Sequence, residues 1–240
     1  TVVAFETEVS TLWDEPHIAS DTFKQEAKDW VSSLVAGGST NFHDACITGL
    51  ETFTEANAAN VMLVLSDGEP TAGPITSTPE LLIAISEANS KKVSISAVAF
   101  GYGADEGLMA NMASQNNGFF TFIQTDEEAT TKIIDFYKQF ATPIASGYSI
   151  HIEGAYLTAS LVPLKDSPFF NGSEVLLSGL YETSISIETT IHYASDEIYS
   201  NYATDASIVY PYVESIWAQH RLSYLLNQVL LEGDTNVLRA

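Results

Sequence analysis

The residues best placed to do chemistry lie in two polar loops, at residues 37–41 and 66–71. The second loop follows a run of five apolar residues, 61–65, and carries a carboxylate, Asp67, shortly after that run. A continuous apolar run bounded by polar residues and Gly68 is typical of a central parallel strand buried on both faces. Because an open α/β sheet binds its ligand beyond the carboxyl ends of its strands, Asp67 is at a ligand position. The alternative is that Asp67 and Gly68 form only a turn.

The first loop, residues 37–41, precedes a helix that we expect to start directly after Asn41. Asn41 and Asp44 suit this start, because a side-chain oxygen caps a free N–H group and a carboxylate in the first turn interacts favourably with the helix dipole. His43 neighbours Asp44, and adjacent side chains on a helix are expected to point in different directions. Thr40 lies just before this helix, and the alternative is that it only leads the chain into it.

Other patterns that support catalysis in known enzymes are incomplete. The five histidines show no metal-ligand spacing. Ser66 and Asp67 do not belong to a Gly-x-Ser-x-Gly nucleophile elbow. The Gly-Tyr-Gly segment at residues 101–103 lacks the third glycine and the helix start of a dinucleotide-binding loop. We therefore expect no catalytic residues, and a hydrolase that uses Asp67 is the weakest alternative.

The elements expected along residues 1–142 alternate between helix and strand. A hairpin over residues 1–13 comes first. The expected helices cover residues 21–34, 42–55, 78–89, 105–116 and 126–140, and the expected strands cover residues 61–65, 93–100 and 118–123. Strands separated by helices of this length predict an α/β domain with a doubly wound, mostly parallel sheet.

The pattern changes near Pro143, where we expect a domain boundary. Four strands without intervening helices predict a small antiparallel β domain at residues 143–208. They are expected at residues 147–156, 160–164, 174–181 and 184–193. Pro211 opens a helix that runs to about residue 231, so residues 209–240 form a C-terminal helical segment.

The composition is that of an acidic globular chain. Its 240 residues include 31 acidic and 9 basic ones, which gives a formal net charge of −22. Such a surface repels phosphate groups and anionic lipids, so we expect no binding to nucleic acid or to membrane surfaces. It suits divalent cations, a saline medium or a basic partner, although an acidic face that only keeps the protein in solution explains the charge as well. No apolar run approaches the ~18 residues of a membrane span.

Two single residues bear on the cellular compartment. Cys46 is the only cysteine, so the chain has no internal disulfide. It lies on the apolar side of an expected helix, and we interpret it as a small core residue. Asn171 begins an Asn-Gly-Ser glycosylation pattern, a short motif that fits a secreted protein but often occurs by chance.

Several segments together resemble a von Willebrand factor A domain, and in particular the inter-alpha-trypsin inhibitor heavy chains. Residues 37–45 resemble the family's GGTN…DA segment, and residues 65–71 resemble its LTDGEPT segment. The resemblance continues beyond the A domain in residues 169–179, and residues 213–218 are similar to the family's ERLWA helix. It implies an extracellular, metal-dependent adhesion or interaction module rather than an enzyme.

The resemblance also implies a metal-ion-dependent adhesion site made by three loops. In the family the first loop supplies an Asp-x-Ser-x-Ser motif, the second a threonine and the third an aspartate. By position, Thr40 matches the second loop and Asp67 the third. A hydroxyl and a carboxylate are hard oxygen donors suited to Mg²⁺ or Ca²⁺, which leaves coordination positions for water or a partner's carboxylate. Nearby residues that the match includes are Ser39, Asn41, Asp44, Gly68 and Glu69.

The first motif of that site does not occur in this sequence, and Thr1 matches the start of the family's second strand. In the family the first strand lies in the middle of the sheet. A sheet without it leaves backbone donors and acceptors unpaired, at a cost of roughly 1–3 kcal/mol each. We therefore expect a sheet that lacks its own first central strand. A complementary polypeptide, most simply the rest of the same precursor, is expected to supply that strand and the Asp-x-Ser-x-Ser motif.

Two main hypotheses follow for function. The leading one is an extracellular or cell-surface protein of the heavy-chain type, which binds a protein or matrix ligand with an acidic group through Mg²⁺ or Ca²⁺. The alternative is a structural component of an extracellular or surface assembly, in which the metal site is vacant or vestigial.

Overall fold

A computed structural model describes most of the chain. The described residues are 1–54, 59–141, 143–145, 147–154, 156–157, 160–162, 169–170, 175–182, 185–192, 197–203 and 210–232. The expected glycosylation position, Asn171, lies outside these residues. The chain forms two compact units, Thr1–Phe136 and Tyr137–Ala240.

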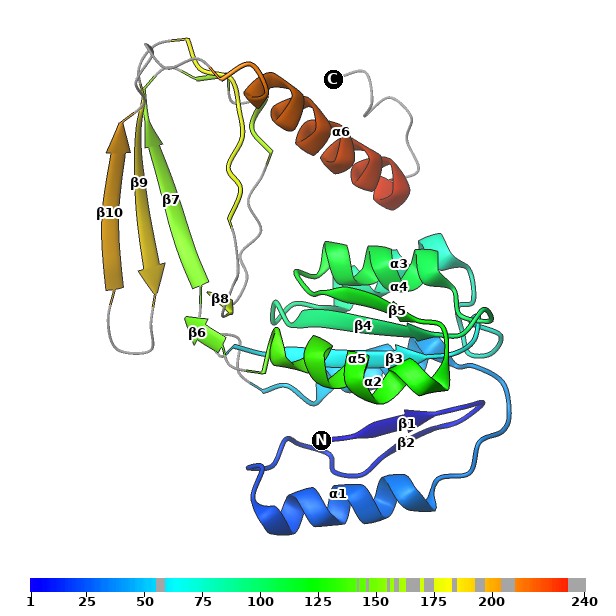
Figure 1. Ribbon diagram of the computed structural model, residues 1–240. Helices are drawn as coiled ribbons and strands as arrows, with labels where there is room; N and C mark the ends of the chain where they lie inside the picture. Colours follow the sequence, from blue (N-terminus) through cyan, green and yellow to red (C-terminus); the bar gives the residue numbers. More distant parts are fainter. Residues whose placement is uncertain are drawn as a thin grey trace. The chain divides into compact units, whose positions relative to one another are not determined.

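The first unit is an α/β fold built on a parallel sheet (Figure 1). β3 (Val61–Ser66), β4 (Ser94–Phe100) and β5 (Phe120–Ile123) pair in parallel in the order β3-β4-β5. Earlier in the chain, β1 (Val3–Phe5) and β2 (Val9–Thr11) form an antiparallel hairpin. The expected parallel α/β arrangement is therefore confirmed.

Helices alternate with these strands as the sequence predicts. They are α1 (Asp21–Ser33), α2 (Phe42–Glu51), α3 (Thr78–Ala88), α4 (Glu106–Gln115) and α5 (Asp126–Lys138). α2 ends before the predicted end at residue 55. The Thr52 hydroxyl donates a hydrogen bond of 2.8 Å to the Gly49 carbonyl, and such side-chain bonds compete with the helical pattern of the backbone.

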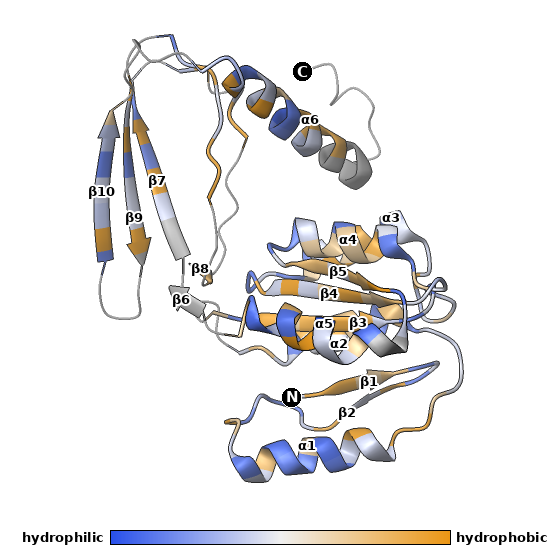
Figure 2. Ribbon diagram, viewed as in Figure 1, coloured by the Kyte–Doolittle hydropathy of each residue, from blue (hydrophilic) through white to orange (hydrophobic). Residues whose placement is uncertain are grey.

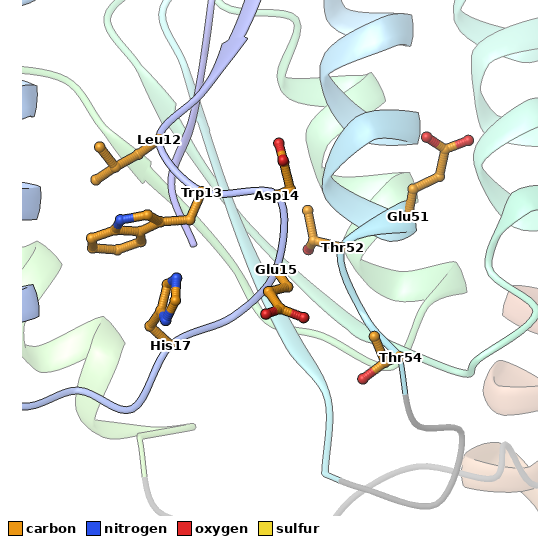
Figure 3. Close-up of a pocket in the computed structure, with 8 residues that line it drawn as sticks. All are labelled: Leu12, Trp13, Asp14, Glu15, His17, Glu51, Thr52 and Thr54. Carbon is orange, nitrogen blue, oxygen red and sulfur yellow. The ribbon is translucent and has the colours of Figure 1, made fainter.

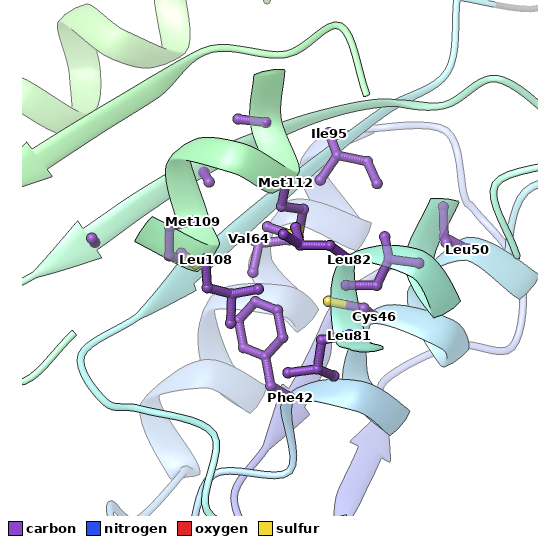
Figure 4. Packing of buried hydrophobic residues seen from close by; sticks show 14 of the residues in the cluster. Phe42, Cys46, Leu50, Val64, Leu81, Leu82, Ile95, Leu108, Met109 and Met112 are labelled. Carbon is purple, nitrogen blue, oxygen red and sulfur yellow. The ribbon is translucent and has the colours of Figure 1, made fainter. Parts of the chain in front are cut away.

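The core of the first unit lies between the sheet and a layer formed by α2, α3 and α4 (Figure 4). Every residue of β4 except Phe100 is buried, and Figure 2 shows the hydrophobic character of β3 and β4. Cys46 is in this core and is 1% exposed, which confirms its interpretation as a core residue. Burial raises the pKa of the Cys46 thiol to about 12, so the thiol stays protonated and unreactive at neutral pH.

Two surfaces of the first unit that carry apolar residues are partly exposed. Among the described residues, β3 pairs with β4 on one side and has no strand on its other side. Leu65 on β3 is 41% exposed, and α1 has no buried residue, with Val31 49% exposed. The prediction that residues 61–65 are buried on both faces is wrong, because β3 lies at an edge of the described sheet.

The second unit contains an antiparallel sheet, as expected (Figure 1). β7 (Gly147–Glu153), β9 (Ser186–His192) and β10 (Glu197–Ala203) pair in the order β7-β9-β10. β6 (Pro143–Ala145) and β8 (Phe169–Phe170) form a short separate pair. β6, β8 and β10 lie outside the strands expected from the sequence.

Two other strands were predicted in this unit, but their described parts, residues 160–162 and 175–181, form no regular strand, and Tyr181 makes only an isolated antiparallel bridge with Tyr156. The two segments are joined by single hydrogen bonds, such as the one from Val162 N–H to the Ser178 carbonyl at 3.3 Å. The Ser160 hydroxyl accepts a hydrogen bond from Leu180 N–H at 2.7 Å and donates one to the Leu157 carbonyl. A side chain thus takes backbone partners that a regular ladder would use.

α6 (Val213–Glu232) confirms the expected C-terminal helix. It holds the irregular segments of the second unit through side chains. Trp217 Nε1–H donates to the Ser160 carbonyl at 3.0 Å, and Arg221 donates to the Leu161 carbonyl at 3.3 Å. In the described part of the chain, no helix combines the length and the apolar character needed to cross a membrane.

One side chain ties two helices of the first unit together and gives a test of the packing. Asp105 accepts a hydrogen bond from Leu108 N–H at 2.8 Å, which caps α4, and one from the Thr78 hydroxyl at 2.7 Å, at the start of α3. We predict that Asp105→Ala lowers the free energy of unfolding of the first unit by about 1–2 kcal/mol. Asp105→Asn, which keeps an oxygen for the cap, should lose clearly less. Urea unfolding of both variants measures the difference, and an Ala variant as stable as the parent would contradict the role of the cap.

Candidate metal centre

The loop that precedes α2 and the loop that follows β3 are joined by backbone hydrogen bonds. The Thr40 carbonyl accepts from Thr71 N–H at 3.0 Å and from Ala72 N–H at 3.1 Å. In return, Thr40 N–H donates to the Thr71 hydroxyl at 2.9 Å. A Cβ placed on Gly68 would lie 3.1 Å from Thr40 Oγ1, so the hydroxyl of Thr40 lies against the residue that follows Asp67. The structure therefore brings the two predicted loops together at the carboxyl end of β3.

The turn of the β1–β2 hairpin supports the Thr40 loop from its other side. Asn41 N–H donates to the Glu6 carbonyl at 2.7 Å, and Ser39 N–H donates to the Thr7 hydroxyl at 3.0 Å. Gly38 has a φ of +75°, and a Cβ there would fall 1.6 Å from the Glu6 carboxylate. A glycine is needed at this position, because the backbone is left-handed and the space for a side chain is taken. This role of the hairpin turn was not expected from the sequence.

Asn41 and Asp44 are structural members of the site. Asn41 Oδ1 accepts from Asp44 N–H at 3.2 Å, which caps α2, and Asn41 Nδ2–H donates to Asp44 Oδ2 at 2.9 Å. The other oxygen of Asp44 lies 2.7 Å from His43 Nδ1. The expectation that His43 and Asp44 point in different directions is therefore wrong. Both residues are in the first turn, where no preceding turn constrains their side chains.

Hydrogen bonds hold the carboxyl group of Asp44 in its charged form. The bond from Asn41 contributes most to lowering the pKa of Asp44 below its ordinary value, and the bond with His43 adds to it. A carboxylate with a lowered folded pKa stabilises the fold above its unfolded pKa, and this contribution is lost as the pH falls through the folded pKa. Because both oxygens of Asp44 already have partners, we interpret it as a support for the loop rather than as a ligand.

A third loop, residues 101–103, lies against the backbone of Asp67. A Cβ placed on Gly103 would come within 2.9 Å of the Asp67 carbonyl oxygen, and Gly101 has a φ of +63°. Gly101 N–H donates to the Ile123 carbonyl at 2.8 Å, which ties this loop to β5. This Gly-Tyr-Gly segment resembles part of a dinucleotide-binding motif, and its contact with Asp67 was not expected from the sequence. Two glycines directly after a buried strand were the signal for a close backbone contact.

The accessible oxygen donors at this edge are few. Asp67, Glu69 and Ser39 are exposed, and Thr40 is half-buried. The hydroxyl of Ser66 is occupied, since it donates to the Gly68 carbonyl at 3.2 Å. The described residues contain no group of three or more His, Cys, Asp or Glu side chains able to hold a metal ion. The hydroxyl of Thr40 and the carboxylate of Asp67 fit Mg²⁺ or Ca²⁺ chemically, provided that water or another segment supplies the other oxygen donors.

A separate hollow of about 600 Å³ lies at the opposite end of α2 from Thr40 (Figure 3). It is formed by the segment that follows β2 and by the carboxyl end of α2 with the residues that follow it. The lining residues are Leu12, Trp13, Asp14, Glu15, His17, Glu51, Thr52 and Thr54. This hollow is not part of the candidate metal centre.

The requirement for glycine in the Thr40 loop can be tested with a matched pair of variants. Gly38→Ala places a side chain in a left-handed backbone conformation and against Glu6, so we expect a loss of about 1–2 kcal/mol in the free energy of unfolding. A Cβ placed on the neighbouring Gly37 would have no atom within 4 Å, so Gly37→Ala is the control and should change stability little. Thermal and urea unfolding measure both, and equal effects of the two variants would contradict the assignment.

Comparison with known proteins supports this description of the fold. The model of the von Willebrand factor type A domain family matches residues 1–122. Inter-alpha-trypsin inhibitor heavy chain H4 of Bos taurus is 22% identical over 267 residues, which covers 100% of this chain and 29% of the relative. Heavy chain H3 of Homo sapiens is 27% identical over 191 residues, covering 74% of this chain and 21% of the relative. The chain thus spans less than a third of the length of these curated relatives.

Solved structures share the same fold at low sequence identity. A von Willebrand factor type A protein from Catenulispora acidiphila has a TM-score of 0.68 at 13% identity, covering 93% of this chain and 63% of that one. The ArnB paralog VWA2 from Sulfolobus acidocaldarius has a TM-score of 0.53 at 16% identity, covering 86% and 60%. The family match extends over half of the chain, and the heavy-chain likeness extends over most of it. The chain therefore belongs to the von Willebrand factor type A domain family and is a distant homologue of the inter-alpha-trypsin inhibitor heavy chains.

Proposed function

We propose that this chain is an extracellular or cell-surface interaction module of the heavy-chain type, which binds a carboxylate-bearing protein or matrix ligand through a divalent cation. One observation supports this proposal above the others. The Thr40 loop and the loop after Asp67 are joined by three hydrogen bonds, at the sheet edge where α/β folds bind their ligands. We propose no catalytic role for either residue.

In this proposal Thr40 and Asp67 hold Mg²⁺ or Ca²⁺. Bound there, the cation supplies an electrophilic centre that attracts a carboxylate of the partner. Asp67 directly follows the last residue of β3 and is exposed. Its carboxylate is therefore accessible to an ion from solvent. Thr40 contributes a neutral hydroxyl, and a site with one carboxylate leaves most of the charge of the ion for the partner. Glu69 is also exposed and adds to the local negative potential that concentrates cations.

The exposed surfaces of the first unit support the proposal of a complementary polypeptide. Among the described residues, β3 has one side without a strand, and Leu65 is 41% exposed. α1 has an apolar face but no buried residue. An added strand beside β3 would pair its backbone and cover apolar side chains, and it would bring further oxygen donors if it ends in the Asp-x-Ser-x-Ser motif. We propose the rest of the same precursor as its source.

The structural alternative has one observation in its favour. The described residues contain no group of three or more His, Cys, Asp or Glu side chains that could hold a metal ion, at the candidate centre or elsewhere. A family member with a vacant or vestigial site would then act through the rigid surfaces of its α/β fold.

In either case we propose that the chain is organised as residues 1–142, 143–208 and 209–240, and that Asn171 is glycosylated in an extracellular setting.

Replacing a residue that is proposed to bind the metal distinguishes the two proposed functions. We predict that Mg²⁺ or Ca²⁺ raises the stability of the parent chain by RT ln(1 + [L]/Kd), about 1.4 kcal/mol at ten times Kd. Asp67→Ala should lose most of this gain, and Thr40→Ala should lose part of it. Asp29→Ala on the exposed α1 removes the same charge elsewhere and is the control, because a chain of net charge −22 binds cations diffusely. Thermal unfolding at several cation concentrations measures the effect. If Asp67→Ala responds to cations like the control, the metal site is refuted and the structural alternative takes its place.

The complementary polypeptide can be sought directly. We predict that protein isolated from its native source contains a segment with Asp-x-Ser-x-Ser bound to, or continuous with, this chain. Intact mass and peptide mapping under native and denaturing conditions would detect it. Hydrogen exchange should show the β3 amides protected in that material and faster in the isolated chain. Equal exchange of β3 in both samples would argue against an added strand.

A further inference from the structure

The antiparallel sheet of the second unit ends in a strand that has no neighbouring strand on its outer side among the described residues. β10 is the outermost strand of β7-β9-β10 (Figure 1), and among the described residues it pairs only with β9. Its pairing with β9 is continuous over seven residues, from Glu197 to Ala203, so no bulge interrupts it. The strand contains no proline, lysine or arginine. Natural edge strands usually carry a bulge, a proline or charged side chains, lysine above all, which prevent them from pairing with another chain. The charged residue of β10 is Glu197, at the start of the strand.

The register places apolar residues on one face of this sheet. Ile198 pairs with Ile191, and Tyr202 pairs with Ile187, which in turn pairs with Ile152 of β7. Ile198 is 51% exposed and Tyr202 is 60% exposed. The outer strand thus presents a strip of two large apolar side chains, with Ser200 between them. On the other edge strand, β7, Ile152 of this face is half-buried.

The sequence of β10 is complementary to itself about Ser200. If two copies of the strand pair antiparallel about this residue, Ile198 of each copy lies opposite Tyr202 of the other, on the apolar face. Aliphatic and aromatic side chains in such directly opposed positions stabilise sheets. Glu197 of each copy lies opposite Ala203 rather than opposite another acid. We propose that β10 is the interface through which a second copy of this chain binds, making one six-stranded antiparallel sheet.

The charges of the sheet are compatible with this pairing. The two Glu197 side chains would be about 20 Å apart along the interface, at roughly 3.4 Å per residue. This exceeds the screening length of about 8 Å at physiological ionic strength. On the polar face, Glu188 of β9 is within 3.4 Å of Asn201 Nδ2, and its hydrogen bond with Tyr199 raises the pKa of that tyrosine. The carboxylate of Glu188 therefore has hydrogen-bond partners within its own copy of the chain. The large net charge of each chain opposes association, so the dimer should strengthen as salt is added.

The proposal is independent of the metal centre and is tested on the full chain. Sedimentation velocity over a wide range of concentration should show a monomer–dimer equilibrium that persists in chelator. Ile198→Lys and Tyr202→Glu, made singly, should each weaken the dimer about tenfold or more, because each removes two symmetry-related apolar pairs. The double variant Ile198→Lys/Tyr202→Glu places opposite charges against each other across the two-fold axis. It should recover most of the lost affinity.

Disulfide cross-linking tests the register. In the proposed pairing the Ser200 residues of the two copies lie opposite each other. Their Cα atoms are about 5 Å apart, a distance that a disulfide can bridge. Mild oxidation of Ser200→Cys should therefore give a covalent dimer. Glu197→Cys is the matched control. It should give no covalent dimer, because the two residues at position 197 are far apart in the proposed pairing. Cys46 is buried and does not interfere. A chain that stays monomeric, or a dimer in which Ser200→Cys cross-links no better than Glu197→Cys, would overturn the proposal. Circular dichroism checks that each variant is folded.

Discussion

The backbone carbonyl of Thr40 is the point on which the carboxyl edge of the first unit depends. It accepts hydrogen bonds from two consecutive N–H groups, those of Thr71 and Ala72, and so joins the start of α2 to the loop after β3. Everything else at this edge is arranged to keep that junction in place. The hairpin turn supports the Thr40 loop from one side, and Gly38 gives the backbone conformation that the turn requires. A junction made by backbone groups leaves the hydroxyl of Thr40 and the carboxylate of Asp67 available for a ligand.

Much of this edge follows from local sequence, and the rest depends on contacts between distant segments. The parallel α/β alternation was predictable because helix and strand periodicities and capping residues such as Asn41 act over a few residues. The contact of Gly103 with the Asp67 backbone, and that of Thr7 with Ser39, join residues far apart in the chain. No local pattern specifies such a pair. The second unit was harder to predict for a similar reason. A serine side chain at Ser160 replaces ladder bonds that the alternation of residues 160–164 suggested.

The strands β3 and β10 each have one edge without a partner in the described part of the chain, and these edges differ in their physical requirements. β3 belongs to a parallel sheet and carries apolar residues on both faces, so a partner strand must also be covered by helices. α1 also carries exposed apolar residues, such as Val31. β10 belongs to an antiparallel sheet with one apolar and one polar face, and such a sheet tolerates water on its polar side. A copy of the same strand therefore satisfies β10, whereas β3 requires a partner that is apolar on both faces and that continues into a buried element.

The strong negative charge of the chain has opposite effects on its two kinds of binding. It concentrates cations near exposed carboxylates such as Asp67, and it opposes the approach of a second acidic chain. The individual acids are not equivalent, however, because their surroundings determine what they do. Asp44 is held in its charged form by Asn41 and His43 and supports the loop, while Asp67 is exposed at the end of a strand. Glu188 is held by Asn201 and Tyr199 within its own sheet. Local hydrogen bonding, rather than net charge, therefore decides which carboxylates remain available for an ion and which serve the fold.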